Sequence, residues 1–392
     1  MREFADLARS ALHESGYSIK AAARALKYDI SYLSRVLNGK QKPSVKLAES
    51  LDALVGAGGE LAAVVMKPAD PTKQPLREDL PDLDEAQGED FVLAIRNISQ
   101  RLITLDNEVR GLPIARLAAC SFKVVHRRLG EGDYALRYER DIQSAAAELA
   151  EIAGWALFNN EGQFDAARRF SQEALYLAGL CGDRSTELIT LQNLGMIAGW
   201  AGRPREELAI ARSVLRRGRL TPRVEAVFRA REGQGLAGTG DPTSAAHAFD
   251  RARALLQESS PRSEPHWAWW ISLNEIDRQQ GRMQHETGQW LDSIPTLERA
   301  TEKHPGAQVG YENVASVRLL DSLVAVKSWR AAEEEAAKLI PAISETSSGV
   351  TLKILRQATR RGKRTSAAPS GLRDALDQID GALDADPYEL SM

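Results

Sequence analysis

Cysteine is scarce in this chain of 392 residues, and the two that occur, Cys120 and Cys181, cannot make a disulfide-stapled scaffold. We interpret both as small apolar core residues in a reducing compartment. Long apolar runs are missing too, because no stretch approaches the ~18 residues that a membrane span requires. Residues 1–6 carry no apolar segment of the kind found in export signals. The sequence therefore predicts a cytoplasmic protein without membrane contact.

Strand patterns and catalytic motifs are also absent. We find no sustained alternation of apolar and polar residues, which excludes a mainly β fold. Six scattered histidines and no cysteine pair predict no metal site, and no nucleophile motif appears. Residues 233–238 match G-x-G-x-x-G, but they follow a helical pattern rather than a strand, so we interpret them as close helix packing. We expect neither an enzyme nor a bound cofactor.

Apolar residues make up 43% of the chain and charged residues 27%, an ordinary globular balance with a net charge of −3. Helical spacing dominates, so the fold class that we predict is all-α. The motifs described below divide it into a five-helix N-terminal helix-turn-helix domain and a C-terminal α-solenoid. The expected boundaries are an N-terminal domain at 1–65, an acidic proline-rich linker at 66–90, helical repeats at 91–364 and a flexible tail at 365–392. Within the tail, the acidic amphipathic segment 372–383 could form one loose helix.

Two short helices near the N-terminus have clear start and stop signals. Ser18 and Asp29 are suitable N-caps, and the Asn-Gly pair at 38–39 ends the second helix. Ala23 and Leu33 are ten residues apart. In a helix-turn-helix, a small residue in the first helix lets the second cross closely, and an apolar residue in the second fills the core between them. Helices over 4–13 and 44–55 would flank this pair.

The segment LSRVLNGK at residues 33–40, with Pro43 after it, resembles the Cro/repressor-like (xenobiotic-response-element) family of bacterial DNA-binding domains. That family often has Gly where this chain has Lys27, and Val or Ile where it has Tyr28, so the turn departs from the pattern. The resemblance implies a double-stranded DNA operator as partner, with the second helix in the major groove.

Positive charge gathers in the same segment, since residues 18–46 hold seven basic side chains and a single acid, Asp29. Such a surplus favours phosphate contacts. By position, the resemblance implies base contacts from Ile30, Ser31, Tyr32 and Arg35, with Arg35 the candidate for a bidentate guanine contact. It implies phosphate contacts from Ser18, Lys20, Ser34, Asn38, Lys40 and Lys42. The alternative is a solvated basic face on a small helical domain.

A repeated pattern fills the centre of the chain. A breaker, then an aromatic residue or proline, then an alanine-rich helix recurs at intervals of 38 to 48 residues, with breakers at Gly162, Gly202, Gly240, Gly288 and Lys327. This resembles the looser tetratricopeptide repeats, in which each unit is two antiparallel helices joined by a turn. One pair cannot cover its own apolar face, so stacked pairs bury a continuous core and leave a concave groove.

The resemblance implies that the first helix of each pair lines this groove. By the repeat's positions, the residues expected to face inward and bind an effector are Asn159, Asn160, Gln192, Met196, Trp200, Gln234, Arg278, Arg282, His285 and Asp321. Amides in such a groove suit an extended peptide backbone, because they both donate and accept. The alternative is a solvated groove with no dedicated ligand. The aromatic group at 266–270, with Trp290, is either core packing or one wall of a pocket.

The basic run at 353–364 lies in a stretch without acids. We interpret it as cations at the C-terminus of the last helix. A second DNA-contacting patch and an anchor for the acidic tail are the alternatives.

Taken together, the chain resembles actinobacterial helix-turn-helix regulators with a C-terminal tetratricopeptide-like domain. That resemblance implies a homodimeric transcriptional regulator whose repeats hold the dimer and sense a peptide or small-molecule effector. The DNA-binding domains of the two copies would contact half-sites about one DNA turn, ~34 Å, apart. The alternative is a helical-repeat scaffold for protein partners that is tethered to DNA.

Overall fold

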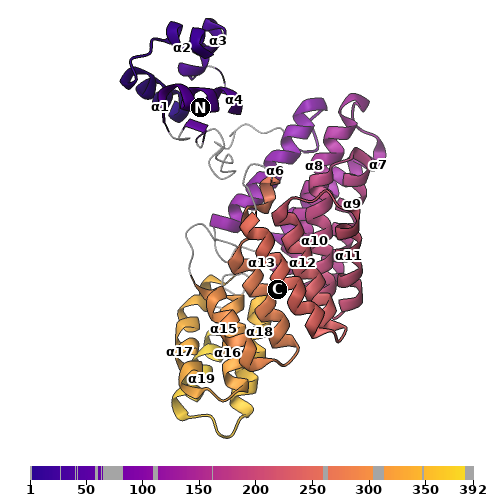
Figure 1. Ribbon diagram of the computed structural model, residues 1–392. Coiled ribbons are helices and arrows are strands. Elements are labelled where there is room, and N and C mark those ends of the chain that lie inside the picture. Colours follow the sequence, from indigo (N-terminus) through magenta and orange to yellow (C-terminus); the bar gives the residue numbers. More distant parts are fainter. Residues whose placement is uncertain are drawn as a thin grey trace. The chain divides into compact units, whose positions relative to one another are not determined.

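The computed structural model describes residues 2–26, 28–39, 41, 43–57, 61–62, 64, 83–108, 114–160, 162–258, 264–302, 313–346 and 348–384. Every regular element in these ranges is helical, which confirms the all-α fold class (Figure 1). The chain divides into two compact units, Met1–Pro75 and Leu76–Met392, called here the N-terminal unit and the C-terminal unit. None of the described helices is both long enough and apolar enough to cross a bilayer.

The described α-helices of the N-terminal unit are α1 (Arg2–Glu14), α2 (Ile19–Leu26), α3 (Ile30–Leu37) and α4 (Val45–Val55). Their apolar faces meet in one core, which almost fully buries Phe4, Leu33 and Leu47. Residues 61, 62 and 64, which follow α4 within the predicted domain 1–65, are helical too. The buried Asp52 carboxylate accepts the backbone N–H groups of Leu61 (3.0 Å) and Ala62 (2.6 Å). A side chain of α4 therefore fixes the start of that last segment.

The C-terminal unit is a succession of helices that pack on their neighbours in the chain. They are α6 (Gly88–Glu108), α7 (Ala115–Glu131), α8 (Glu139–Asn159), α9 (Phe164–Cys181), α10 (Arg184–Trp200), α11 (Pro204–Arg217), α12 (Pro222–Gly238), α13 (Pro242–Glu258), α14 (Leu273–Glu286), α15 (Trp290–Thr301), α16 (Val314–Ala325), α17 (Trp329–Leu339), α18 (Gly349–Arg364) and α19 (Ser370–Asp384). Three short 3₁₀ segments, η2 (Leu136–Tyr138), η3 (His266–Trp270) and η4 (Ile340–Glu345), connect some of them. Figure 1 shows these helices lying side by side in a stacked array.

From α8 onward the helices form pairs: α8 with α9, α10 with α11, α12 with α13, α14 with α15 and α16 with α17. The residue that turns the chain inside each pair has a left-handed backbone, with φ of 63° at Gly162, 72° at Gly202, 91° at Gly240, 76° at Gly288 and 61° at Lys327. Glycine adopts this conformation at little cost, whereas a lysine does not, so Lys327 marks the least regular turn. The breakers therefore lie where the sequence predicts them.

The first helices of the pairs also pack on one another along the unit, from α8 through α10, α12, α14 and α16 to α18. The two ends of this row meet, because the backbone N–H of Gly349 at the start of α18 donates to the carbonyl oxygen of Asn160 at the end of α8 (3.1 Å). This contact differs from the open concave groove that we expect from the repeat pattern. The row of first helices curls far enough to enclose much of its own inner face.

The C-terminal segment also differs from the expected flexible tail. Helix α19 covers residues 370–384, and its Leu372, Leu376 and Ile379 are fully buried against the preceding helices. Lys363 of α18 pairs with the carboxylates of Asp377 (2.6 Å) and Asp380 (2.5 Å). The basic run thus anchors an acidic amphipathic helix, and the prediction of a tail beginning at residue 365 is wrong for 370–384. Residues 385–392 lie outside the described part.

The expected linker at 66–90 is likewise shorter than predicted. Leu83 and Ala86 are buried, and Arg128 of α7 donates through Nη1 to both of their carbonyl oxygens (2.7 and 2.8 Å). Helix α6 then begins at Gly88. Residues 83–90 therefore belong to the C-terminal unit, and residues 65–82 lie outside the described part.

The glycines of the G-x-G-x-x-G match lie inside α12. A Cβ on Gly233 would lie 2.7 Å from the Phe249 ring, and one on Gly235 would lie 2.8 Å from the backbone nitrogen of Leu208. These approaches agree with the helix-packing interpretation. Of the two free cysteines, Cys181 is buried as predicted, whereas Cys120 is exposed, so its assignment to the core is wrong.

Candidate functional site

Helix α3 is held in place by its own sequence at both ends. The Asp29 side chain caps the N-terminus by accepting the backbone N–H of Tyr32 (2.9 Å). At the other end Gly39 takes the left-handed conformation, with φ of 68°. Between them Leu33 and Val36 are buried, and α3 packs on α1 and α2. One face of α3 is therefore locked into the core, and the opposite face is presented to solvent.

The presented face carries the predicted base-contacting residues. Ile30 is 47% exposed and so offers an apolar side chain to a ligand on this face. Arg35 is exposed, and its Nε donates to Oε1 of Gln41 (2.9 Å). Tyr32 is half-buried and stacks on Tyr28, with ring centroids 5.9 Å apart. The side chain of Ser31 lies outside the described part of the structure.

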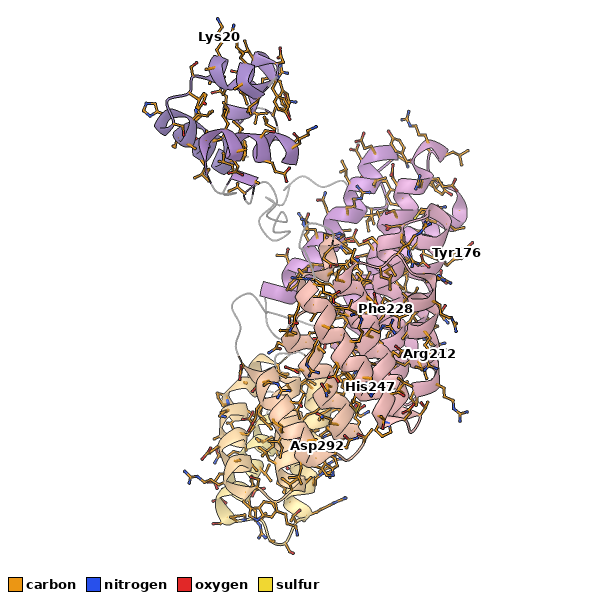
Figure 2. All side chains as sticks on the ribbon, in the orientation of Figure 1. Lys20, Tyr176, Arg212, Phe228, His247 and Asp292 are labelled. Atoms are coloured by element: carbon orange, nitrogen blue, oxygen red, sulfur yellow. The ribbon has the colours of Figure 1, made fainter. Side chains whose placement is uncertain are left out.

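The predicted phosphate-contacting residues divide into two groups. Ser18 caps α2 by accepting the backbone N–H of Ala21 (3.2 Å), and Lys20 in the first turn of that helix extends into solvent (Figure 2). Asn38 instead donates its Nδ2 to the carbonyl oxygen (2.8 Å) and the hydroxyl (3.3 Å) of Ser34. Those two side chains close the end of α3, which reduces what they offer to a phosphate. Lys40 and Lys42 lie outside the described residues.

This arrangement suits contact with a duplex. A short helix with one free face fits the width of a major groove, and a guanidinium on that face, such as that of Arg35 in the last turn of α3, can donate two hydrogen bonds to a guanine edge. The N-terminus of α2, with Ser18 and Lys20, adds backbone N–H groups and a cation where a phosphate would lie.

The ten predicted effector residues all lie on the first helices α8, α10, α12, α14 and α16, and none is exposed. Those that are half-buried are Trp200, Arg278 and His285; those that are buried are Asn159, Asn160, Gln192, Met196, Gln234, Arg282 and Asp321. The structure brings some of them together, because His285 Nε2 lies 2.9 Å from Asp321 Oδ2 and the Arg282 guanidinium lies 4.4 Å from the Trp200 ring centroid. Others face different partners: Gln192 accepts from Arg231, and Gln234 donates to the backbone of Gln279. Their side chains fill the interior between the first helices rather than lining one open pocket.

At the α8 end of this interior lie two acids that the sequence analysis missed. Burial, with the negative charge of Glu148, raises the pKa of Glu151 to about 8, and Asn193 donates to its carboxylate. Burial also raises the pKa of Glu148. Their spacing of three residues on a helix predicted to face inward could have signalled a shared face.

The middle of the interior holds an ion pair between α11 and α12. Glu207 and Arg231 are both nearly inaccessible, and their side chains lie 3.4 Å apart. Burial raises the pKa of Glu207 to about 7, although Arg231 and Arg282 oppose this rise. The Glu207 carboxylate also lies against Gly199 of α10, where a Cβ would lie 2.1 Å from Oε2. No sequence pattern marks a pairing between residues 24 positions apart on separate helices.

At the far end are Glu286, Arg318 and Arg361, which the sequence analysis also missed. Arg318 of α16 and Arg282 of α14 both contact Glu286, and both lie over the Trp200 ring. Arg361 of α18 binds Asp321 (2.7 Å) and lies 4.7 Å from the Trp290 ring centroid.

The aromatic residues of η3 are expected from the sequence to be either core residues or one wall of a pocket, and they do not all behave alike. Trp267 is buried, and its Nε1 donates to Ser185 at the start of α10 (3.1 Å), so it is a core residue. Trp269 is 49% exposed. The described residues contain no group of three or more histidine, cysteine, aspartate or glutamate side chains placed to hold a metal ion.

Comparison with protein families gives one match, in which a family model described as a helix-turn-helix domain covers residues 3–65. A search of curated proteins finds no match. The matched range contains α1 to α4, including the capped helix α3 with its exposed face. Residues 3–65 are therefore a helix-turn-helix domain, the type of domain with which transcription regulators bind DNA.

Proposed function

We propose that the chain is a sequence-specific transcriptional regulator that inserts α3 into the major groove of an operator. The observation that carries this proposal is the free face of α3, on which Ile30 and Arg35 are exposed while Leu33 and Val36 hold the helix in the core. Arg35 reads a guanine, and Ile30 contacts a thymine methyl. Ser18 and Lys20 set the register on the phosphates. The proposal assigns no catalytic step to the chain and places it in the cytoplasm.

The regulator binds as a homodimer. One such domain makes few contacts, and linking two copies raises the affinity through effective concentration. Exposed apolar side chains on α9 support an interface between copies, because Tyr176 is 63% exposed and Leu180, one turn later, is 53% exposed. Figure 2 shows Tyr176 at the outer edge of the C-terminal unit.

The C-terminal unit senses a peptide or small-molecule effector, in the manner of a tetratricopeptide-like domain. Its interior supports this role, since it encloses amides, acids and guanidiniums that a well-packed apolar core would replace at little cost. The effector acts by binding two forms of the unit unequally, which changes the spacing of the two DNA-binding domains.

Selection of bound sequences from a random DNA pool by the full-length chain tests the DNA-binding proposal. We expect inverted half-sites about one turn, ~34 Å, apart. Recovery of single, unpaired sites would overturn the dimer, and recovery of no shared sequence would overturn specific recognition. Sedimentation of the protein, with Tyr176→Glu as the variant and Leu136→Glu as a matched exposed control, tests the α9 interface independently of DNA.

A further inference from the structure

Four side chains meet where α10, α14 and α16 converge, and we call them the Trp200 cluster: Trp200, Arg282, Glu286 and Arg318. Arg282 Nε donates to Glu286 Oε1 (2.8 Å), and Arg318 Nη2 lies 3.4 Å from the same oxygen. The two guanidinium carbons lie 4.4 and 4.7 Å from the centroid of the Trp200 ring. One carboxylate oxygen thus serves two cations that share one aromatic surface.

Burial is uneven within the Trp200 cluster. The side chains of Arg282 and Arg318 are 6% and 3% exposed, whereas that of Glu286 is 40% exposed. The guanidiniums therefore lie beneath the carboxylate, and the carboxylate lies on the solvent side. Glu286 is therefore the charged group of the Trp200 cluster that solvent reaches most readily.

The Trp200 cluster also holds fewer negative charges than positive ones, because two arginines share one glutamate. Burial lowers the pKa of Arg318 to about 9; Glu286 opposes this, while the positive charges of Arg282 and Arg278 add to it. The nearby Glu207 already pairs with Arg231, and a pKa of about 7 leaves it partly protonated at neutral pH. Among the described residues, the buried Nε of Arg318 has no hydrogen-bond partner. An unshared donor on a buried cation costs free energy that a second acceptor would recover.

We propose that Arg282 and Arg318 bind an oxyanion carried by the effector, a carboxylate or a phosphate, and that Glu286 occupies its place when the effector is absent. Guanidinium forks match two oxygens of such a group, and the Trp200 ring gives them a flat support. The ligand oxyanion displaces Glu286 outward and supplies the acceptor that Arg318 Nε lacks. Because the Trp200 cluster joins three first helices, the exchange alters how α10, α14 and α16 pack. This inference rests on the proposed sensing function.

Binding of small probes to the full-length chain tests the site without an identified effector. The probes are acetyl-triglycine with a free carboxylate, the same peptide as its C-terminal amide, and inorganic phosphate. The chain is labelled with fluorotryptophan, and the ¹⁹F resonance of Trp200 is assigned by Trp200→Phe. We expect the carboxylate, the phosphate or both to shift this resonance saturably, and the amide to bind at least about tenfold more weakly. The stronger of the two anions identifies the source of the oxyanion.

Two variants separate a ligand site from a purely structural cluster. Glu286→Gln removes the competing carboxylate, so the effective anion binds at least about tenfold more tightly, while Arg318→Gln abolishes the response. Glu334→Gln, an exposed carboxylate paired with Arg330 on α17, is the matched control and changes nothing. The wild-type comparison of acid with amide needs no variant to fold. Equal responses to acid and amide with no response to phosphate, or an unchanged affinity in Glu286→Gln, would overturn the site.

The site and the sensing function fail in different ways. If a cell extract releases the protein from its operator but no anion shifts the Trp200 resonance, the oxyanion site is wrong and sensing stands. If the anion binds as described but leaves the affinity for the operator unchanged with and without Glu286→Gln, the site stands and its link to DNA binding is overturned.

Discussion

The basic side chains that the structure describes in the N-terminal unit lie in water, whereas the C-terminal unit encloses several of its own. Lys20, Arg24 and Arg35 are exposed on a domain with little interior. Arg231 and Arg318 are each only 3% exposed and depend on carboxylates from other helices. Exposed cations attract a large anion from a distance and are screened by salt. Enclosed cations are costly unless paired, so they fix which helices lie together and leave the unit responsive to whatever changes the pairing.

The largest expected effect contrasts two arginine–glutamate pairs that both join α11 to α12. Arg231→Ala leaves Glu207 buried without its partner, so we expect the C-terminal unit to lose about 3–5 kcal/mol of unfolding free energy. Arg212→Ala removes a pair with Glu232 in which the arginine is 47% exposed, and Figure 2 shows Arg212 pointing outward. That change costs about 0–1 kcal/mol. Urea unfolding of the full-length variants checks both values, and equal losses would show that burial does not distinguish the two pairs.

The next prediction concerns pH. Because burial raises the pKa of Glu151 from its ordinary value of 4.5 to about 8 on folding, the folded unit retains a proton that the unfolded chain loses. The contribution of Glu151 to the unfolding free energy is therefore fully present below pH 4.5. It is lost between pH 4.5 and 8, at up to about 1.4 kcal/mol per pH unit. Glu151→Gln removes this dependence and keeps an oxygen for the Asn193 amide. Urea unfolding at several pH values between 5 and 8 measures the difference between variant and wild type.

Glu334→Gln is the control for this experiment, because that carboxylate is 61% exposed and its partner Arg330 is almost wholly in water. Its pH curve should follow the wild type. Parallel curves for wild type and Glu151→Gln would mean that Glu151 is ionised in the folded chain across this range.

These buried pairs mark what the sequence predicts poorly. The caps at Ser18 and Asp29 and the turns at Gly162 and Gly202 follow from local chemistry, since a cap or a left-handed glycine turn is decided within a few residues. The pairing of Glu207 with Arg231 depends on how two helices cross, and the contact of Gly349 with Asn160 depends on curvature summed over every pair between them. The spacing of apolar residues indicates which face of a helix is buried, but it does not determine the curvature of the row of helices.

Helix α19 is a second case in which the sequence pattern does not show which segments pack on each other. The acidic amphipathic pattern of 372–383 is visible in the sequence, and so is the basic run at 353–364. Neither alone shows that one covers the other, because a short amphipathic segment is marginal as a helix until it has a surface to pack on. The Leu376 side chain lies directly against Gly362, where a Cβ would clash with it. A pattern that indicates a mobile tail in isolation indicates a docked helix once its partner is placed.

We expect a smaller effect when an exposed basic side chain of the N-terminal unit is removed and DNA binding is measured. Arg35→Ala should weaken operator binding by about 1–3 kcal/mol and relax the preference at one base pair, because a bidentate guanine contact is lost. Lys20→Ala should weaken cognate and random DNA alike and lower the salt dependence by about one phosphate contact. Titrations of both variants on both DNAs, at two salt concentrations, measure these differences. If the two variants behave identically, α3 is not the helix that reads bases.

The smallest expected effect isolates the single hydrogen bond that starts α3. Asp29→Ala removes the acceptor of the Tyr32 N–H bond and should cost about 1 kcal/mol, whereas Asp29→Asn keeps a capping oxygen and should cost only a few tenths. Hydrogen exchange of the α3 amides in the full-length chain reports this loss in the N-terminal unit alone. Equal losses in the two variants would mean that the carboxylate contributes by its charge rather than by capping. The Asp29 cap lies in water, whereas the Glu207–Arg231 pair is buried. We therefore expect Arg231→Ala to cost several times more unfolding free energy than Asp29→Ala, and the ratio of the two losses measures the effect of burying a charged pair.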